Sequence, residues 1–218
     1  MTDSDKRYGR KWVYVIIVIV VLLPLITVFF LKEGFAIRNS AGASKYLLAD
    51  TTLQLPDYVF ISQRGDTISK TRMLDKVCIL DFTSYSCGKK IDEKDSLLFQ
   101  LQEDYYGKTK GFRILSVTLT PEQDSEKQLA FMSERYQARE VWHFLRSDDS
   151  ASVGLRKFCQ SVANNNSDTD LFCPRFVYLV DGYGNVRGTY DPLVKVQYDA
   201  LYGDILYLIN HLYVEEAN

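Results

Sequence analysis

The chain has 218 residues, which is enough for one domain with a sizeable core once an N-terminal segment is set apart. Its 26 basic and 28 acidic residues leave a formal net charge of -2, and the sequence contains no long basic stripe. Because binding to a phosphate backbone would have no electrostatic basis, nucleic acid is excluded as an expected partner.

The first predicted element is a transmembrane helix over residues 12–31. This segment reads WVYVIIVIVVLLPLITVFFL and holds no charged residue. At 1.5 Å per residue it is long enough to cross a hydrocarbon core of about 30 Å, and membrane helices tolerate the interruption at Pro24. Basic residues are denser before the span than after it, so the positive-inside rule places residues 1–11 in the cytoplasm as a short tail.

An uncleaved anchor is favoured over a cleaved signal peptide. Ala41-Gly42-Ala43 resembles a cleavage site, but the apolar run is too long for a signal peptide and the site lies too far beyond it. The protein is therefore expected in the cell membrane as a single-pass protein. Its domain is expected on the extracytoplasmic side, which is the periplasm in a Gram-negative cell.

A linker and one domain are predicted after the span. Residues 32–52 contain glycines and serines without sustained periodicity, so they are predicted to tether a domain at residues 53–218. The domain opens with LQLPDYVFISQRGDTIS, in which apolar and polar residues alternate around Arg64-Gly65-Asp66. This pattern is typical of a β-hairpin.

The rest of the domain alternates strands and helices. Val77–Phe82 is short and nearly continuously apolar, as strands buried on both faces are. Apolar positions at helical spacing predict a helix after it, with Ile91, Lys94, Leu98, Leu101 and Tyr105 on one face. The later predicted elements are a strand at 112–119, a helix opened by Pro121, a strand at 141–145, a helix at 150–159, a hairpin with strands at 176–180 and 186–190, and a last helix at 196–213. This order predicts a thioredoxin-like α/β domain with a central mixed β-sheet flanked by helices.

Four cysteines carry the candidate chemistry: Cys78, Cys87, Cys159 and Cys173. In an extracytoplasmic compartment they can be bridged, and the sequence alone does not choose among the pairings. Cys78 lies inside a predicted strand and is interpreted as core packing. Cys87 lies where a strand turns into a helix, where the helix dipole and nearby lysines favour a thiolate. Cys87 is therefore the leading functional candidate.

The remaining candidate ligands are interpreted as structural. His143 and His211 are the only histidines, so a histidine-rich metal site is excluded. Glu122 and Asp124 lie where a helix is predicted to begin, and there their charges complement the helix dipole.

Taken in order, several segments resemble the Sco/SenC family, membrane-tethered thioredoxin-fold proteins that help deliver copper to cytochrome c oxidase. The resemblance rests on the ordered set rather than on any single piece: LPDYVFISQRGDTIS, KVCILDFTSYSC, LTPEQDSEKQLAFMSERY, VWHFLRSD and FVYLVDGYGNVRGTYD. It implies copper as the metal that is handled and a cytochrome c oxidase subunit as a partner.

The departures from the family fall on its ligand positions, which are two cysteines separated by three residues and a distant histidine. Cys87 matches the first cysteine, Ile91 stands where the second is expected, and Cys173 stands at the position of the histidine. The resemblance therefore implies a divergent member in which Cys87 and Cys173 bind copper, since two thiolates suit Cu(I).

Other roles stay open at this point. A disulfide from Cys87 to Cys173, or from Cys159 to Cys173, competes with a metal site. With Cys87 as nucleophile and Cys173 as resolving cysteine, the protein would be an extracytoplasmic thiol-disulfide oxidoreductase, although loss of the close cysteine pair counts against rapid exchange. The last alternative is a thioredoxin-fold binding module without metal or redox activity.

Overall fold

The structure is a computed structural model that describes residues 19–28, 42–48, 54–73, 75–84, 87, 89–147, 151, 154, 158, 161 and 174–215. The chain divides into two compact units, Met1–Gly42 and Ala43–Asn218.

In the first unit, residues 19–28 form a helix whose side chains are exposed. These residues lie inside the predicted membrane span 12–31, the rest of which is outside the described residues, as is the predicted tail 1–11. Within the described ranges, no helix is both long and apolar enough to cross a membrane. The membrane anchor therefore stays a prediction.

The second unit is built on one sheet of seven strands in the order β2-β1-β5-β4-β3-β6-β7. Strands β3, β4 and β5 are parallel, whereas β1, β6 and β7 pair antiparallel to their neighbours. The strands are β1 (Val59–Ser62), β2 (Thr67–Ser69), β3 (Val77–Thr83), β4 (Phe112–Thr118), β5 (Trp142–Arg146), β6 (Val177–Val180) and β7 (Val186–Tyr190). The predicted mixed sheet is confirmed.

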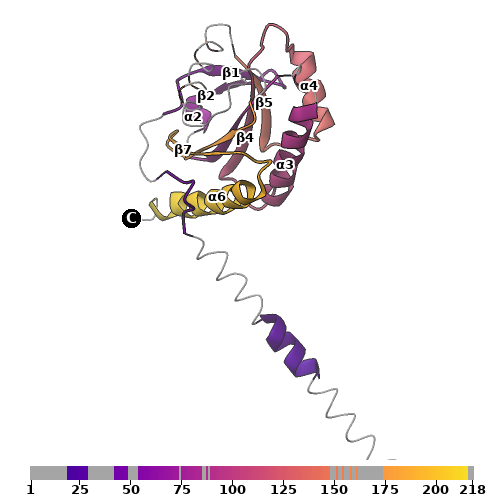
Figure 1. Cartoon of the computed structure of the whole chain (residues 1–218), viewed down its shortest axis with the longest axis vertical. Helices are drawn as coiled ribbons and strands as arrows, with labels where there is room; N and C mark the ends of the chain where they lie inside the picture. The colour runs from indigo at the N-terminus through magenta and orange to yellow at the C-terminus, as the bar shows by residue number, and fades with distance from the viewer. Residues whose placement is uncertain are drawn as a thin grey trace, which may run out of the picture. The chain divides into compact units, whose positions relative to one another are not determined.

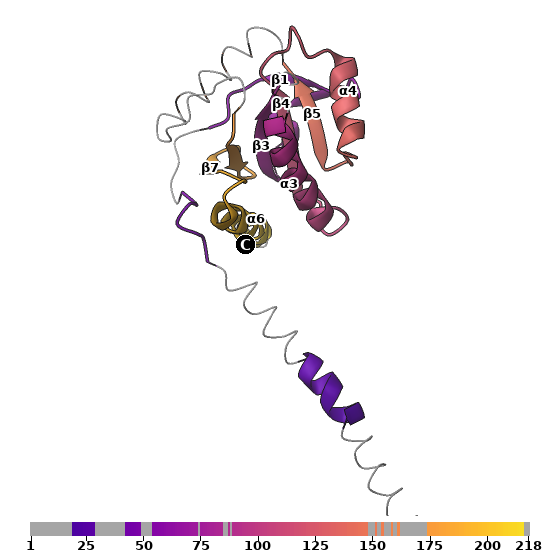
Figure 2. The same ribbon diagram turned by 45° about the vertical axis from the view of Figure 1, so that its right-hand side comes forward.

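The three long helices pack on one face of the sheet, whose central strand β3 is buried on both faces. Alternate residues of β3 enter two separate cores, Ile79 on one face and Leu80 on the other. The first core includes Leu98, Leu129 and Ile205, one from each of the three long helices, and Figures 1 and 2 show α3 and α4 alongside the strands. The helices are α2 (Lys70–Met73), α3 (Lys89–Tyr105), α4 (Glu126–Arg135) and α6 (Lys195–Glu215).

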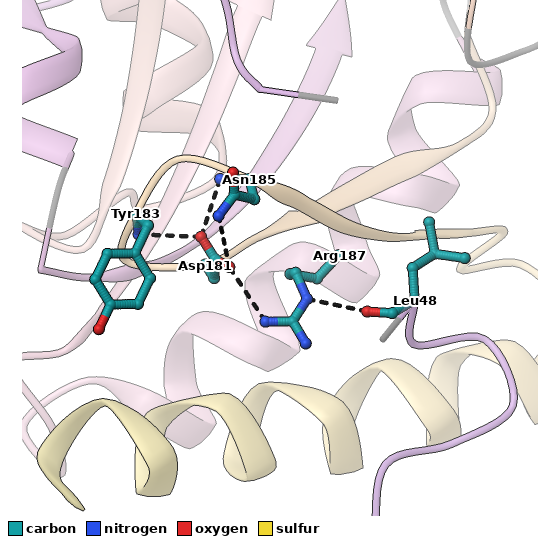
Figure 3. A network of polar contacts seen from close by, with 5 residues as sticks. All are labelled: Leu48, Asp181, Tyr183, Asn185 and Arg187. Atoms are coloured by element: carbon teal, nitrogen blue, oxygen red, sulfur yellow. Dashed lines mark hydrogen bonds and ion pairs between the residues drawn. The ribbon is translucent and has the colours of Figure 1, made fainter. Parts of the chain in front are cut away.

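The folded unit begins earlier than the predicted boundary at residue 53. Asp204 of α6 accepts hydrogen bonds from the backbone nitrogen and hydroxyl of Ser44, at 2.7 and 2.5 Å. Leu47 is buried in the core, and Arg187 donates to the Leu48 carbonyl oxygen at 3.0 Å (Figure 3). Residues 44–48, within the predicted linker 32–52, are thus bound to the domain.

Both predicted hairpins are present. The β1–β2 turn contains Gly65 at φ +79°, and the β6–β7 turn contains Gly184 at φ +82°. In the second turn, Asp181 accepts hydrogen bonds from the backbone nitrogens of Tyr183 and Asn185 at 3.0 and 2.9 Å (Figure 3). The predicted helix at 150–159 lies mostly outside the described residues.

Candidate functional site

Cys87 lies in the turn between β3 and α3, as the sequence predicts. Its backbone nitrogen donates to the Ser84 carbonyl oxygen at 3.0 Å, and α3 begins two residues later at Lys89. The side chain is partly buried and packs against the core on the α3 side. Cys87 is bonded in a disulfide. In this state its sulfur is not a thiolate.

The partner of Cys87 is not among the described residues. Cys78 keeps a thiol, is buried, and donates a hydrogen bond to the Lys76 carbonyl oxygen at 3.7 Å. Burial raises the pKa of Cys78 to about 12, which confirms its interpretation as a core residue. Cys159 and Cys173 both lie outside the described residues, so the predicted link from Cys87 to Cys173 stays a prediction.

A chain of buried hydroxyl groups fixes the Cys87 turn to the neighbouring strand. Ser84 and Thr120 share a hydrogen bond of 2.7 Å between their hydroxyls, and Thr120 donates to Asp124 at 2.8 Å. Thr118 also donates to Asp124. The carboxylate of Asp124 is buried. The prediction that it complements a helix dipole is therefore wrong: α4 begins after Ser125, and Asp124 instead accepts hydrogen bonds from the end of β4.

Lys94, on the buried face of α3, joins the two backbone segments that lead toward Cys87 and Cys173. Its ammonium group donates to the carbonyl oxygens of Phe82 and Pro174 at 2.8 and 2.9 Å. The same group forms an ion pair of 2.6 Å with Asp81 of β3. Two of the three ammonium hydrogens can thus be donated to carbonyl oxygens, and the ion pair compensates the charge. This is how a lysine only 1% exposed is accommodated in the core.

The Asp81 carboxylate extends this network into the sheet. Its second oxygen accepts a hydrogen bond of 2.9 Å from Ser116, which in turn accepts one of 3.0 Å from the Trp142 indole nitrogen. The polar contacts therefore run without interruption from β5, through β4 and β3, to residues 174–176, which precede β6 and form the Pro174 segment. Such a network orders its members because each buried polar group would cost stability without its partner.

Asp95, the residue after Lys94, is a second buried carboxyl group beside this cluster. Neither of its oxygens has a hydrogen-bond partner. Burial, with the nearby Asp81 charge, raises the pKa of Asp95 well above its ordinary value. The nearby Tyr136 hydroxyl acts in the opposite direction on the pKa of Asp95. This hydroxyl donates its hydrogen bond to Asp92 at 2.7 Å. Burial likewise raises the pKa of Asp81, against the opposing effects of Lys94 and Ser116.

Sequence reasoning missed this cluster although two signals were present. Asp81 is the single charged residue in the apolar run of β3, and Lys94 falls on the apolar face of the predicted helix. A buried carboxylate and a buried ammonium on neighbouring elements are expected to pair, since neither is tolerated alone.

Neither histidine lies in a group of metal-ligating side chains within the described part of the chain. His143 is partly buried in β5, where burial and the nearby Arg113 and Arg64 lower its pKa to about 4. His211 is exposed near the end of α6, with its Nδ1 atom 2.7 Å from the Tyr207 carbonyl oxygen. Among the residues that the structure describes, no three histidine, cysteine, aspartate or glutamate side chains gather as a metal site.

Comparisons with known proteins point to one family in sequence and in fold. The SCO1 protein homolog of Bacillus subtilis (strain 168) is 22% identical over 156 residues, which are 70% of this chain and 81% of the homolog. No family model matches the chain.

Solved structures of Sco proteins share the fold. A SCO1/SenC family lipoprotein from Bacillus anthracis str. Ames superposes with a TM-score of 0.61 at 17% identity, over 74% of this chain and 98% of that one. Bradyrhizobium japonicum ScoI with copper bound has a TM-score of 0.56 at 13% identity, over 70% and 98%. BsSco, described as a member of the Sco family of cytochrome c oxidase assembly proteins with a disulfide switch, has a TM-score of 0.53 at 19% identity, over 72% and 98%.

Proposed function

Because this chain is a divergent relative of the Sco family, we propose that it handles copper for the assembly of cytochrome c oxidase. The observation that carries the proposal is the place of Cys87: it lies in the strand-to-helix turn of a Sco-like fold, and its sulfur forms a disulfide. The sequence resemblance assigns this residue to the first family cysteine. The proposal includes an anchor at residues 12–31, a domain outside the cytoplasm and an oxidase subunit as partner.

The proposed copper ligands are the thiolates of Cys87 and Cys173. Thiolates are soft ligands that suit Cu(I), and two of them form a sufficient first set without a histidine. The donor set fits copper only in the reduced protein, because a sulfur within a disulfide is no longer a thiolate. Copper is therefore cargo that the reduced chain accepts and the oxidised chain does not.

The switch between these states is a two-electron exchange with an external dithiol. One thiolate of the dithiol attacks a sulfur of the protein disulfide, which releases the other protein sulfur as a thiolate and forms a mixed disulfide. The second thiolate of the dithiol then attacks the dithiol's own sulfur in the mixed disulfide. This releases the second protein sulfur as a thiolate and closes the disulfide of the oxidised dithiol. Both protein cysteines are now reduced, and Cu(I) replaces their protons.

A Cu(I) titration of reduced and oxidised full-length protein tests the proposal. The reduced protein is expected to bind one Cu(I) per chain in competition with a chromophoric chelator, and the oxidised protein none. Replacing Cys87 or Cys173 by serine should abolish binding, whereas the matched variants Cys78→Ser and Cys159→Ser should retain it. Binding that survives Cys87→Ser overturns the proposal.

A second candidate is thiol-disulfide exchange without copper, and the disulfide at Cys87 is the observation that favours it. In that case Cys87 would exchange with a client protein, and Cys173 would resolve the mixed disulfide. Reduced protein that binds no Cu(I) but transfers electrons to a disulfide client would select this function. A protein that does neither is a binding module built on the same fold.

A further inference from the structure

We propose that Lys94 is the positioning residue that holds the Pro174 segment against the Cys87 turn and thereby sets how readily the Cys87–Cys173 disulfide closes. The inference rests on the proposed function, because it assigns Cys173 as the partner of Cys87. It adds a residue that acts through the carbonyl oxygens of Phe82 and Pro174.

The geometry places one ammonium group between the two chain segments. The Lys94 nitrogen lies 2.8 Å from the carbonyl oxygen of Phe82, near the end of β3, and 2.9 Å from that of Pro174. The carbonyl oxygens of Phe82 and Pro174 are therefore separated by no more than the two hydrogen-bond lengths added together. Phe82 precedes the turn that carries Cys87, and Pro174 directly follows Cys173 in sequence.

The contact with Pro174 joins residues 80 positions apart in the chain. Pro174 precedes β6, which starts at Val177, and the Lys94 hydrogen bond and the ion pair between Arg175 and Asp191 both hold this segment before the sheet ladder begins. A hydrogen bond donated by a charged group is among the stronger ones in proteins. The ion pair with Asp81 helps to fix the position of the ammonium group beside both carbonyl oxygens.

Closure of a disulfide depends on the effective concentration of one thiol at the other. A segment held at one end samples fewer positions than one that is not held, so the entropy lost on closure is smaller. Removing the Lys94 contact should therefore weaken closure without altering either cysteine. The balanced reaction is protein disulfide plus two reduced glutathione giving protein dithiol plus one oxidised glutathione.

The variants must separate this role from general stability. Lys94→Met alone would leave Asp81 charged and buried without its partner, so the test uses the double variant Asp81→Asn/Lys94→Met. Asp95 is left unchanged in every variant. Ser116→Ala is the matched control: it removes the hydrogen bond to the other oxygen of Asp81 but leaves the Lys94 contact with Pro174 in place.

The experiment equilibrates the full-length protein in detergent with glutathione redox buffers, traps thiols by alkylation and maps the disulfide by mass spectrometry. Far-ultraviolet circular dichroism confirms folding of each variant. The equilibrium constant for closure should fall by about tenfold or more in the double variant and stay within about twofold in Ser116→Ala. An unchanged constant in the double variant, or an equal fall in both, overturns this inference alone. A link from Cys87 to Cys159 in the unaltered protein overturns the proposed cysteine pair and this inference with it.

Discussion

Lys94 and Pro174 lie 80 positions apart in the chain, yet the lysine ammonium group donates a hydrogen bond of 2.9 Å to the proline carbonyl oxygen. The lysine comes from the helix that follows Cys87, and the proline from the segment that follows Cys173. The contact therefore relates the two parts of the chain that, in the proposed function, carry the reactive sulfurs.

Removal of Lys94 alone should destabilise the domain strongly. The Asp81 carboxylate would remain in the core without its ion-pair partner, and breaking a buried pair in this way costs about 3–5 kcal/mol. The double variant Asp81→Asn/Lys94→Met should lose less than the single variant, because it leaves no buried charge. Urea unfolding of the oxidised proteins measures both values. Equal losses would mean that the pair with Asp81 is not what makes Lys94 important to stability.

The fold was predictable from the sequence because its signals are local. Val77–Phe82 reads as a buried strand, and the two glycine turns read as hairpins, since each depends on only a few adjacent residues. The Lys94 cluster was not predicted, because it depends on which side chains meet across the sheet, the helix and the Pro174 segment. The same reason explains Asp124, whose partners are Thr118 at the end of β4 and Thr120 in the loop that follows, not residues of the helix beside it.

The boundary of the domain was also missed because its evidence is long-range. Residues 44–48 have no periodicity of their own, and they are held by Asp204 and Arg187, far along the chain. A chain that starts at Leu53 should therefore be less stable than one that starts at Ala43 by about 3 kcal/mol, from the lost hydrogen bonds and the burial of Leu47. Thermal and urea unfolding of the two truncated proteins give this difference. Identical stability would show that the segment contributes nothing to the domain.

Asp95 should make the stability of the protein fall as the pH rises. Its folded pKa is raised above the unfolded value of about 3.9. Stability from the protonated group is thus fully present below the unfolded pKa and is lost as the pH rises toward the folded pKa. Asp95→Asn carries no titrating proton, so its advantage over the unaltered protein should grow as the pH rises above the unfolded pKa. Unfolding free energies at several pH values test this, and a difference that does not change with pH would contradict the raised pKa of Asp95.

Cys78 should resist alkylation in the native protein. Its side chain is buried and its pKa is raised to about 12 by burial, so very little thiolate is present at neutral pH. Labelling with iodoacetamide, followed by mass spectrometry, should modify Cys78 only after denaturation. Cys87, once reduced, is the internal comparison, because it is partly exposed in a turn. Labelling of native Cys78 at the rate of an exposed thiol would contradict its burial in β3.

The central claim is that Cys87 and Cys173 form one reactive pair, and peptide mapping of the oxidised full-length protein under non-reducing conditions tests it most directly. Proteolysis and mass spectrometry identify the peptide that is linked to the one containing Cys87. The account predicts a link to the peptide that contains Cys173. It also predicts that this link disappears when the protein is reduced and loaded with Cu(I). A link from Cys87 to Cys159 would contradict the account, because Cys173 would then lack the partner that the proposed copper site requires.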